Sequence, residues 1–179
     1  MSALTWSESL ALHQPLMDDT HREFIDLLAD VEAAATLPQA EAVARLDRFV
    51  EHTEAHFGQE DEWMLRIGFQ PTNCHARQHA QVLELLREVK RRVRDEAQMA
   101  LIPQLVPALA EWFVPHAQNM DGGLAQVIVA TGFDPATGTM TNPPQAPSDD
   151  VFLSPAEQAA AATETPAGAG PACHSPEVM

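Results

Sequence analysis

The stretch HFGQEDEWMLRIGFQPTNCHARQH, residues 56–79, contains two pairs of potential metal ligands in two successive predicted helices. His56 and Glu60 are four positions apart, and so are His75 and His79. Residues four apart on a helix point from the same face. Each helix should therefore present one pair of ligands to the interior of a helical bundle.

Three further residues of the same chemical types lie on the preceding and following predicted helices. Together the seven residues supply five imidazoles and two carboxylates, a complete set for two transition-metal ions inside a bundle. Each residue taken alone is explained equally well as a core histidine or an exposed acid. Their combination on four helices favours a dinuclear metal centre. The candidate ligands are His21, His56, Glu60, His75, His79, His116 and Asp121.

The number of donors indicates what such a centre could do. Five histidines, two bridging carboxylates and a shared oxo or hydroxo bridge fill all but one of the positions of two six-coordinate ions. A small molecule could then bind to one ion without displacing a protein ligand. Two carboxylates also neutralise less metal charge than the four of ferritin-like di-iron bundles. The set therefore favours reversible dioxygen binding over oxidative chemistry.

Apolar periodicity and boundary residues predict an all-α fold, an up-down-up-down four-helix bundle. Asp18 or Asp19 is expected to cap the first helix, and Thr72 or Asn73 the third. The second helix should end near Gly68. The predicted helices cover about residues 18–31, 39–67, 73–94 and 101–130.

The fourth helix is expected to be irregular. Pro107 and Pro115 would each remove an internal hydrogen bond, which predicts a kink or a late start. His116 and Asp121 are five positions apart, so an ideal helix would offset them by about 140°. Both can serve one metal only if the helix is locally distorted, by a kink at Pro115 or by flexibility at Gly122 and Gly123.

Charge and composition exclude several classes of protein. The 179 residues carry a formal net charge of -16, and all ten Lys and Arg residues lie between Arg22 and Arg94. Such a surface repels nucleic acid and anionic membranes, so neither partner is expected. The chain shows no secretion signal and no apolar run of about 18 residues, which predicts a soluble cytoplasmic protein. Two cysteines are too few for a cysteine-rich metal site.

The composition changes after Gly132, where prolines alternate with Ala, Gly, Ser and Thr. A segment with so few large apolar residues cannot bury enough surface to offset its ordering entropy. We expect a bundle domain over residues 1–133 and a mostly disordered, acidic, Pro/Ala-rich tail over residues 134–179, with a short helix at 155–163 as its one candidate element. An unknown protein partner for the tail is left open.

Apolar residues near the candidate ligands could wall an open coordination position and keep water away from it. Trp112 precedes His116 by four positions, and Ile25 follows His21 by four. A bundle needs an apolar core in any case, so packing is the alternative explanation. The predicted pocket residues are Phe24, Ile25, Phe57, Trp112 and Phe113.

Other kinds of site explain fewer of these residues. A zinc hydrolase built on His75 and His79 would need a glutamate after the first histidine, where this chain has Ala76. A haem bundle would use one or two of the ligands and leave the rest unexplained. Two alternatives remain open: a di-iron redox enzyme acting on peroxide or nitric oxide, and an interaction module that responds to iron or oxygen.

Four motifs in the chain resemble those of the hemerythrin family, and within it the single-domain bacteriohemerythrins. The resemblance covers about residues 6–130 and includes Trp6 in the N-terminal arm. All seven candidate ligands occur in the family's order and spacing. The motifs are MDDTHREF at 17–24, HFGQEDEWM at 56–64, HARQH at 75–79 and WFVPHAQNMD at 112–121.

This resemblance implies two non-haem iron ions joined by an oxo or hydroxo bridge. One iron would be held by His75, His79 and His116 and the other by His21 and His56, with Glu60 and Asp121 bridging them. The second iron would take dioxygen reversibly at its open position, for transport, storage, delivery or sensing rather than catalysis. One departure is His52, which lies four positions before His56 and competes with Glu60 on spacing; a surface imidazole is the simpler interpretation.

Overall fold

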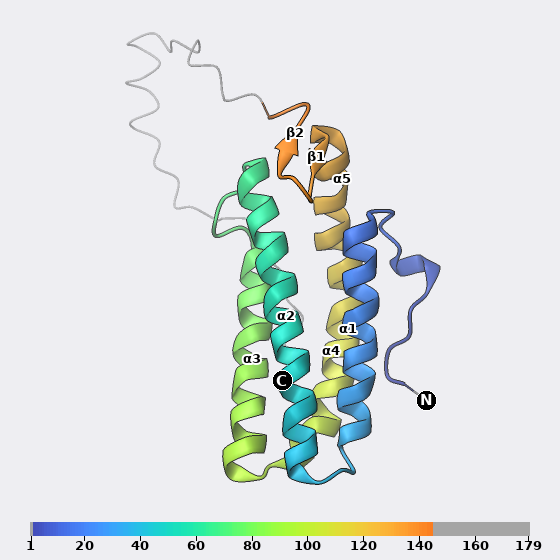
Figure 1. Ribbon diagram of the computed structural model, residues 1–179, viewed down its shortest axis with the longest axis vertical. Helices are drawn as coiled ribbons and strands as arrows, with labels where there is room; N and C mark the ends of the chain where they lie inside the picture. The colour runs from blue at the N-terminus through green and yellow to red at the C-terminus, as the bar shows by residue number, and fades with distance from the viewer. Residues whose placement is uncertain (1, 145–179) are drawn as a thin grey trace, which may run out of the picture.

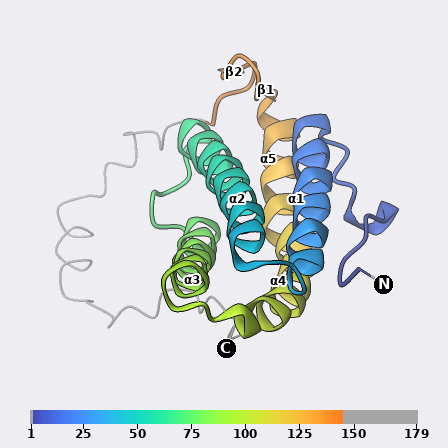
Figure 2. The same cartoon turned by 60° about the horizontal axis from the view of Figure 1, so that its bottom comes forward.

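The computed structural model describes residues 2–144, which form the predicted up-down-up-down four-helix bundle (Figure 1). Seen from the end at which α2 begins, the four helices lie around a common interior (Figure 2). The fourth helix is continuous but has three parts, of which the middle one is π-helical. The bounds are α1 Pro15–Ala34, α2 Gln39–Ile67, α3 Cys74–Glu96, α4 Ile102–His116, η3 Ala117–Asp121 and α5 Gly122–Thr131, with short 3-10 turns η1 Glu8–Leu10 and η2 Met99–Leu101.

The first helix begins before the aspartates that were predicted to cap it. The side-chain oxygen of Gln14 accepts hydrogen bonds from the N–H groups of Leu16 and Met17. Pro15 occupies the first turn, where its missing N–H has no consequence. Asp18 lies inside the helix and accepts the N–H of Leu12 at 2.7 Å. The predicted cap was therefore wrong, because proline and glutamine together start the helix earlier.

The boundaries between α2 and α3 agree with the prediction. Gly68 follows α2 with φ 105°, a left-handed conformation that other residues rarely adopt. The side chain of Asn73 then caps α3 by accepting the N–H of Ala76 at 3.0 Å. These local signals fix where each helix presents its pair of candidate ligands.

The prolines of the fourth helix do not delay its start. α4 begins at Ile102, with Pro103 in its first turn, and both Pro107 and Pro115 lie inside it. The irregularity comes immediately after Pro115, where residues 117–121 form the π-helical segment. The hydrogen bonds change from the α to the π pattern over these residues, and the helix then continues as α5.

Buried apolar residues form two clusters with a polar layer between them. The larger cluster fills the bundle around residues such as Phe24, Phe57 and Phe113. The smaller one includes Met17 and Leu124 and lies at the end of the bundle that carries α5. The candidate ligands lie where the two clusters adjoin, so apolar side chains flank the polar layer on both sides.

A two-stranded hairpin follows α5. The sequence predicted that the tail would begin here, at residue 134. Strands β1 Phe133–Asp134 and β2 Thr139–Met140 pair antiparallel. Gly138, at φ 69°, closes the turn by donating to the carbonyl of Asp134 at 2.7 Å. Burial of Phe133 against the smaller cluster explains why the chain continues to pack here. The predicted disordered tail beyond residue 144 and the short helix at 155–163 lie outside the described residues.

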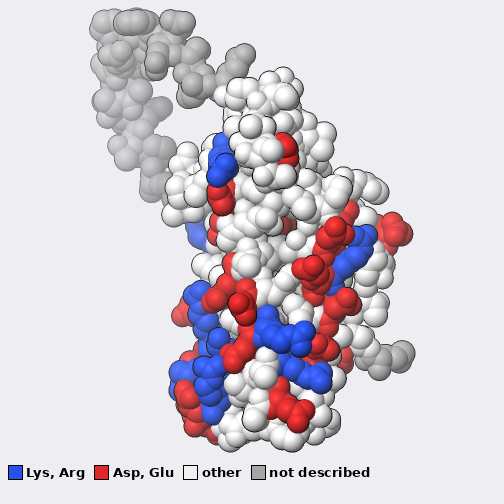
Figure 3. Space-filling view, viewed as in Figure 1, with Lys and Arg blue, Asp and Glu red and all other residues white. Residues whose placement is uncertain are grey.

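Basic and acidic side chains alternate over the lower half of the molecule (Figure 3). On α3, Arg91 and Arg92 pair with Glu88, while Lys90 and Arg94 pair with Asp47 of α2. The basic end of α3 is therefore neutralised by neighbouring acids. Within residues 2–144, no helix combines the length and the apolar character that crossing a bilayer requires.

Candidate metal centre

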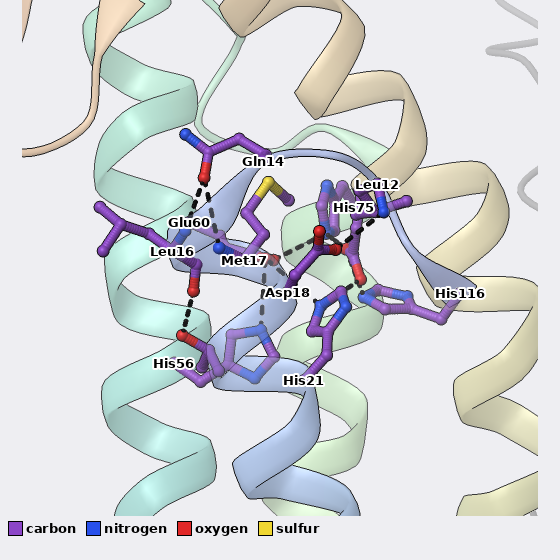
Figure 4. A network of polar contacts seen from close by, with 12 residues as sticks. Leu12, Gln14, Leu16, Met17, Asp18, His21, His56, Glu60, His75 and His116 are labelled. Atoms are coloured by element: carbon purple, nitrogen blue, oxygen red, sulfur yellow. Dashed lines mark hydrogen bonds and ion pairs between the residues drawn. The ribbon is translucent and has the colours of Figure 1, made fainter. Parts of the chain in front are cut away.

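All seven candidate ligands meet in one buried cluster between the four helices. Figure 4 shows His21 from α1, His56 and Glu60 from α2, His75 from α3 and His116 from α4 pointing toward one another. None of the seven is more than 5% exposed. The i, i+4 pairs of α2 and α3 each face the interior, as their spacing predicted. The ligand-capable atoms form two overlapping groups, Glu60, His75, His79, His116 and Asp121 in one and His21, His56 and Glu60 in the other.

Glu60 divides its two oxygens between the histidines of the two groups. Its Oε1 lies 3.2 Å from Nε2 of His56 and 3.9 Å from Nε2 of His21. Its Oε2 lies 3.4 Å from Nε2 of His75 and 3.5 Å from Nε2 of His79. A carboxylate in this position can join two cations.

Asp121 divides its oxygens in the same way from the opposite side. Its Oδ1 lies 2.8 Å from Nε2 of His75 and 3.2 Å from Nε2 of His116. Its Oδ2 lies 3.1 Å from Nε2 of His21. Two carboxylates therefore span a group of three histidines and a group of two.

The π-helical segment is what aligns Asp121 with His116. The N–H of Gly122 donates to the carbonyl of Ala117, five residues back instead of four. Gly122 itself has ordinary helical angles, φ -59° and ψ -39°. The expected local distortion is thus present, but it lies between Pro115 and Gly122 and does not come from flexibility at the glycine pair.

The cluster also contains an unusual number of unpaired polar atoms. Within residues 2–144, the buried side-chain nitrogen and oxygen atoms without a hydrogen-bond partner all belong to His21, His56, Glu60, His75 and Asp121. Leaving a buried polar group unpaired costs about 1–3 kcal/mol. The Nε2 and carboxylate oxygen atoms among them face one another, which indicates that another group satisfies them, and imidazole and carboxylate ligands suit a pair of transition-metal cations.

Two residues that the sequence did not single out hold the outer nitrogens of cluster histidines. Nδ1 of His79 lies 2.9 Å from Oδ1 of Asp61, and Nδ1 of His116 lies 2.8 Å from Oε1 of Gln78. Acceptors in this position fix the orientation and the tautomer of an imidazole. Asp61 directly follows a candidate ligand in the sequence and Gln78 directly precedes one, which is the only sequence signal for them.

The charges in the cluster shift the pKa values of its members. Burial opposes protonation of His75, but the carboxylates of Asp121 and Glu60 outweigh it and raise its pKa to about 9. Burial and the charge of Asp121 favour the protonated form of Glu60, yet His56 and His75 lower its pKa to about 2. The pKa of Asp121 is also well below its usual range, because His116 and other histidines outweigh its burial. Both carboxylates are therefore ionised and available to cations.

Most of the predicted pocket residues touch the histidines of the cluster. Phe113 lies edge-on to His21, with ring centroids 5.2 Å apart, and stacks on Phe24 at 4.6 Å. Phe24 is also edge-on to His56, at 6.4 Å.

Phe57 and Trp112 cover the other group. Phe57 stacks on His79 at 4.0 Å, and Trp112 stacks on His116 at 4.2 Å. Ile25 is buried in the larger apolar cluster. Aromatic rings thus cover both histidine groups.

His52 lies outside the cluster. Its Nε2 is 3.3 Å from the carbonyl of Thr20, and its Nδ1 is 3.6 Å from a carboxylate oxygen of Glu23. Its ring centroid is 6.1 Å from that of His56. It belongs to neither group of ligand-capable atoms, so it is not a candidate ligand, and its side chain is 15% exposed where the sequence predicted a surface imidazole.

Comparison of the sequence with known protein families shows which family has this set of residues. The sequence model of the family described as Hemerythrin HHE cation binding domain matches residues 13–128. The chain belongs to the hemerythrin family. A bacteriohemerythrin of Ralstonia nicotianae is 40% identical over 75% of this chain and 95% of its own length. A bacteriohemerythrin of Stenotrophomonas maltophilia is 28% identical over 73% and 84%, and a myohemerythrin of Theromyzon tessulatum is 22% identical over 65% and 86%.

A hemerythrin domain binds a di-iron centre, and the buried imidazoles and carboxylates of this chain suit one. In general terms the chain is thus a di-iron oxygen-binding protein. The family match begins two residues before α1 and ends within α5. It leaves out most of the N-terminal arm, whose Leu4 and Leu10 are buried in the core, and the hairpin that follows α5.

Proposed function

We propose that this hemerythrin domain holds its two irons with the seven clustered residues. His75, His79 and His116 would bind one iron, His21 and His56 the other, and Glu60 and Asp121 would bridge both. The division of each carboxylate's oxygens between the two histidine groups is the observation that carries this assignment. The unpaired buried atoms of the same residues support it.

The function that this arrangement supports best is reversible binding of dioxygen, for transport, storage, delivery or sensing. Bound ferrous ions supply the electrons and the open coordination position that such binding needs. The two-histidine group has one imidazole fewer than its neighbour, so the open position belongs beside His21 and His56.

The surrounding side chains of the chain favour binding over turnover. Phe24 and Phe113 cover the two-histidine group with apolar rings and limit the access of water and protons. Both rings are at most 1% exposed. We therefore propose a binding protein rather than an enzyme acting on peroxide or nitric oxide.

Iron content and visible absorption spectra test the proposal together. The anaerobically reduced protein is measured before oxygen is added, after addition and again after removal under argon. Two irons per chain and an absorption band that appears with oxygen and disappears under argon are expected. Two irons that oxidise at once and irreversibly would favour a redox enzyme or a sensor. A chain that binds no iron would overturn the ligand assignment.

A further inference from the structure

The outer nitrogens of two cluster histidines are anchored by acceptors on neighbouring helices. Asp61 of α2 accepts from His79 of α3, and Gln78 of α3 accepts from His116 of α4. Because a carboxylate oxygen and an amide oxygen can only accept, Nδ1 of each imidazole carries the proton. Each Nε2 is then left with a lone pair directed into the cluster.

Those two lone pairs face each other. Nε2 of His79 and Nε2 of His116 are 3.2 Å apart. Two acceptors at this distance repel, and a cation bound by both removes the repulsion. This end of the cluster is therefore arranged for a metal ion before any ion binds.

The other histidine group has no such anchors. Nδ1 of His21 and Nδ1 of His56 are both buried and have no hydrogen-bond partner. Aromatic rings pack against both imidazoles, with the ring centroid of Phe113 5.2 Å from that of His21 and the ring centroid of Phe57 5.3 Å from that of His56. Aromatic packing and the carboxylates of Glu60 and Asp121 on the Nε2 side orient these two imidazoles, but no acceptor holds either Nδ1.

We propose that Asp61 and Gln78 are positioning residues that make the three-histidine position the tighter of two unequal metal sites. The ions then bind in order, the first at His79 and His116 and the second at the group of His21. This inference rests on the proposed function, because it requires that each group takes one ion. Partners of this kind typically change metal affinity by about 10–100-fold.

Stepwise titration of the metal-free full-length protein with Co²⁺ under anaerobic conditions tests the order of binding. Co²⁺ accepts the same nitrogen and oxygen donors as Fe²⁺ and reports each bound ion by its visible absorption. A competing chelator gives the affinity of each step. Two steps are expected, the first at least about tenfold tighter than the second. His56→Ala should remove the second step and leave the first.

Asp61→Ala is the decisive variant. It should weaken the first step by about 10–100-fold and leave the second nearly unchanged. The Asp61 side chain is 39% exposed, so its removal leaves no buried cavity. Asp61→Asn keeps an oxygen acceptor and should restore most of the first-step affinity. Gln78→Ala should act in the same direction as Asp61→Ala.

Glu62→Ala is the matched control, because it removes the same charge from the next residue of α2. Glu62 is 60% exposed and pairs with Arg66 instead of a cluster histidine. If it weakens the first step as much as Asp61→Ala, the effect is one of overall charge and the inference is overturned. Two indistinguishable steps in the unmodified protein would also overturn it, while leaving the proposed function intact. Fewer than two bound ions would instead overturn the ligand assignment.

Discussion

Nε2 of His116 lies 3.2 Å from Oδ1 of Asp121, although five positions separate the two residues in the chain. In a regular α-helix that spacing would point the side chains about 140° apart. The π-helical segment between them contains one residue more per turn, as the hydrogen bond from Gly122 to Ala117 shows. The extra residue brings both candidate ligands to the same face of the fourth helix.

Deletion of Asn119 should leave the metal centre largely intact. It gives His116 and Asp121 a four-residue spacing, which a regular α-helix aligns without a π turn. Asn119 is exposed, and its side chain donates to the carbonyl of Pro115 at 2.7 Å, so no core contact is lost. Elemental analysis should still find about two irons per chain, and circular dichroism should show unchanged helicity.

Deletion of Glu111 is the comparison for that experiment. Glu111 is also exposed but lies in the regular part of α4. Its loss turns the following residues by about 100° relative to the bundle and should abolish binding of both irons. If deletion of Asn119 releases the irons as completely, the π turn does not have the role assigned to it.

Glu60→Gln should reduce the iron content to one ion or none. The amide keeps the size of the side chain but loses the charge and one of the two acceptors that face opposite histidine groups. Glu51→Gln changes an exposed acid on the same helix and should retain both irons. Retention of two irons by Glu60→Gln would contradict the bridging position.

The features that the sequence predicted correctly depend on short-range rules. The i, i+4 spacing of His75 and His79 places both on one face of any regular helix, whatever packs against it. Gly68 and Asn73 end and begin helices through their own conformational preferences. Local chemistry was therefore sufficient for the bundle and for the helix faces on which these candidate ligands lie, while their binding of iron stays a prediction.

The features that it missed depend on contacts between segments. Asp61 and Gln78 adjoin ligands in the chain, but adjacent helical residues point about 100° apart, and the sequence does not say which helix faces them. The hairpin is held by Phe133, whose burial requires the smaller apolar cluster to be in place. The early start of α1 was missed because its cap is Gln14, which is not one of the residues that usually cap helices.

The metal-free protein should lose stability as the pH rises from 6.5 to about 9. The pKa of His75 is raised from 6.5 to about 9 when the chain folds, so the folded state holds this proton more tightly. The contribution is complete below pH 6.5 and disappears as the pH passes 9. Its upper size is about 3 kcal/mol. Urea unfolding of the metal-free protein at several pH values measures it.

His75→Gln should flatten that pH dependence. The pKa of His21 is also raised, because Asp121 and Glu60 outweigh its burial. The unfolding free energy of the variant should therefore still fall with pH, but less steeply. His13→Gln changes an exposed position, so the pH dependence of its unfolding free energy should be the same as that of the unmodified protein. A steep slope that persists in His75→Gln would show that another group holds the proton.

Phe113→Leu should speed the irreversible oxidation of the iron-loaded protein. The ring of Phe113 stands edge-on to His21 at 5.2 Å, so a smaller side chain opens space beside the proposed open position. Water and protons then reach that position more easily. The expected loss of stability is about 1 kcal/mol. The measurement is the decay of the oxygen-dependent absorption band at constant temperature.

Phe49→Leu separates this effect from a general loosening of the core. Phe49 is as deeply buried as Phe113, but its ring packs on Phe24 at 5.0 Å instead of on a cluster histidine. It should lose similar stability and leave the decay nearly unchanged. Equal acceleration by both variants would mean that the packing of the whole core limits the access of water, and the wall beside His21 would then have no special part in protecting the centre.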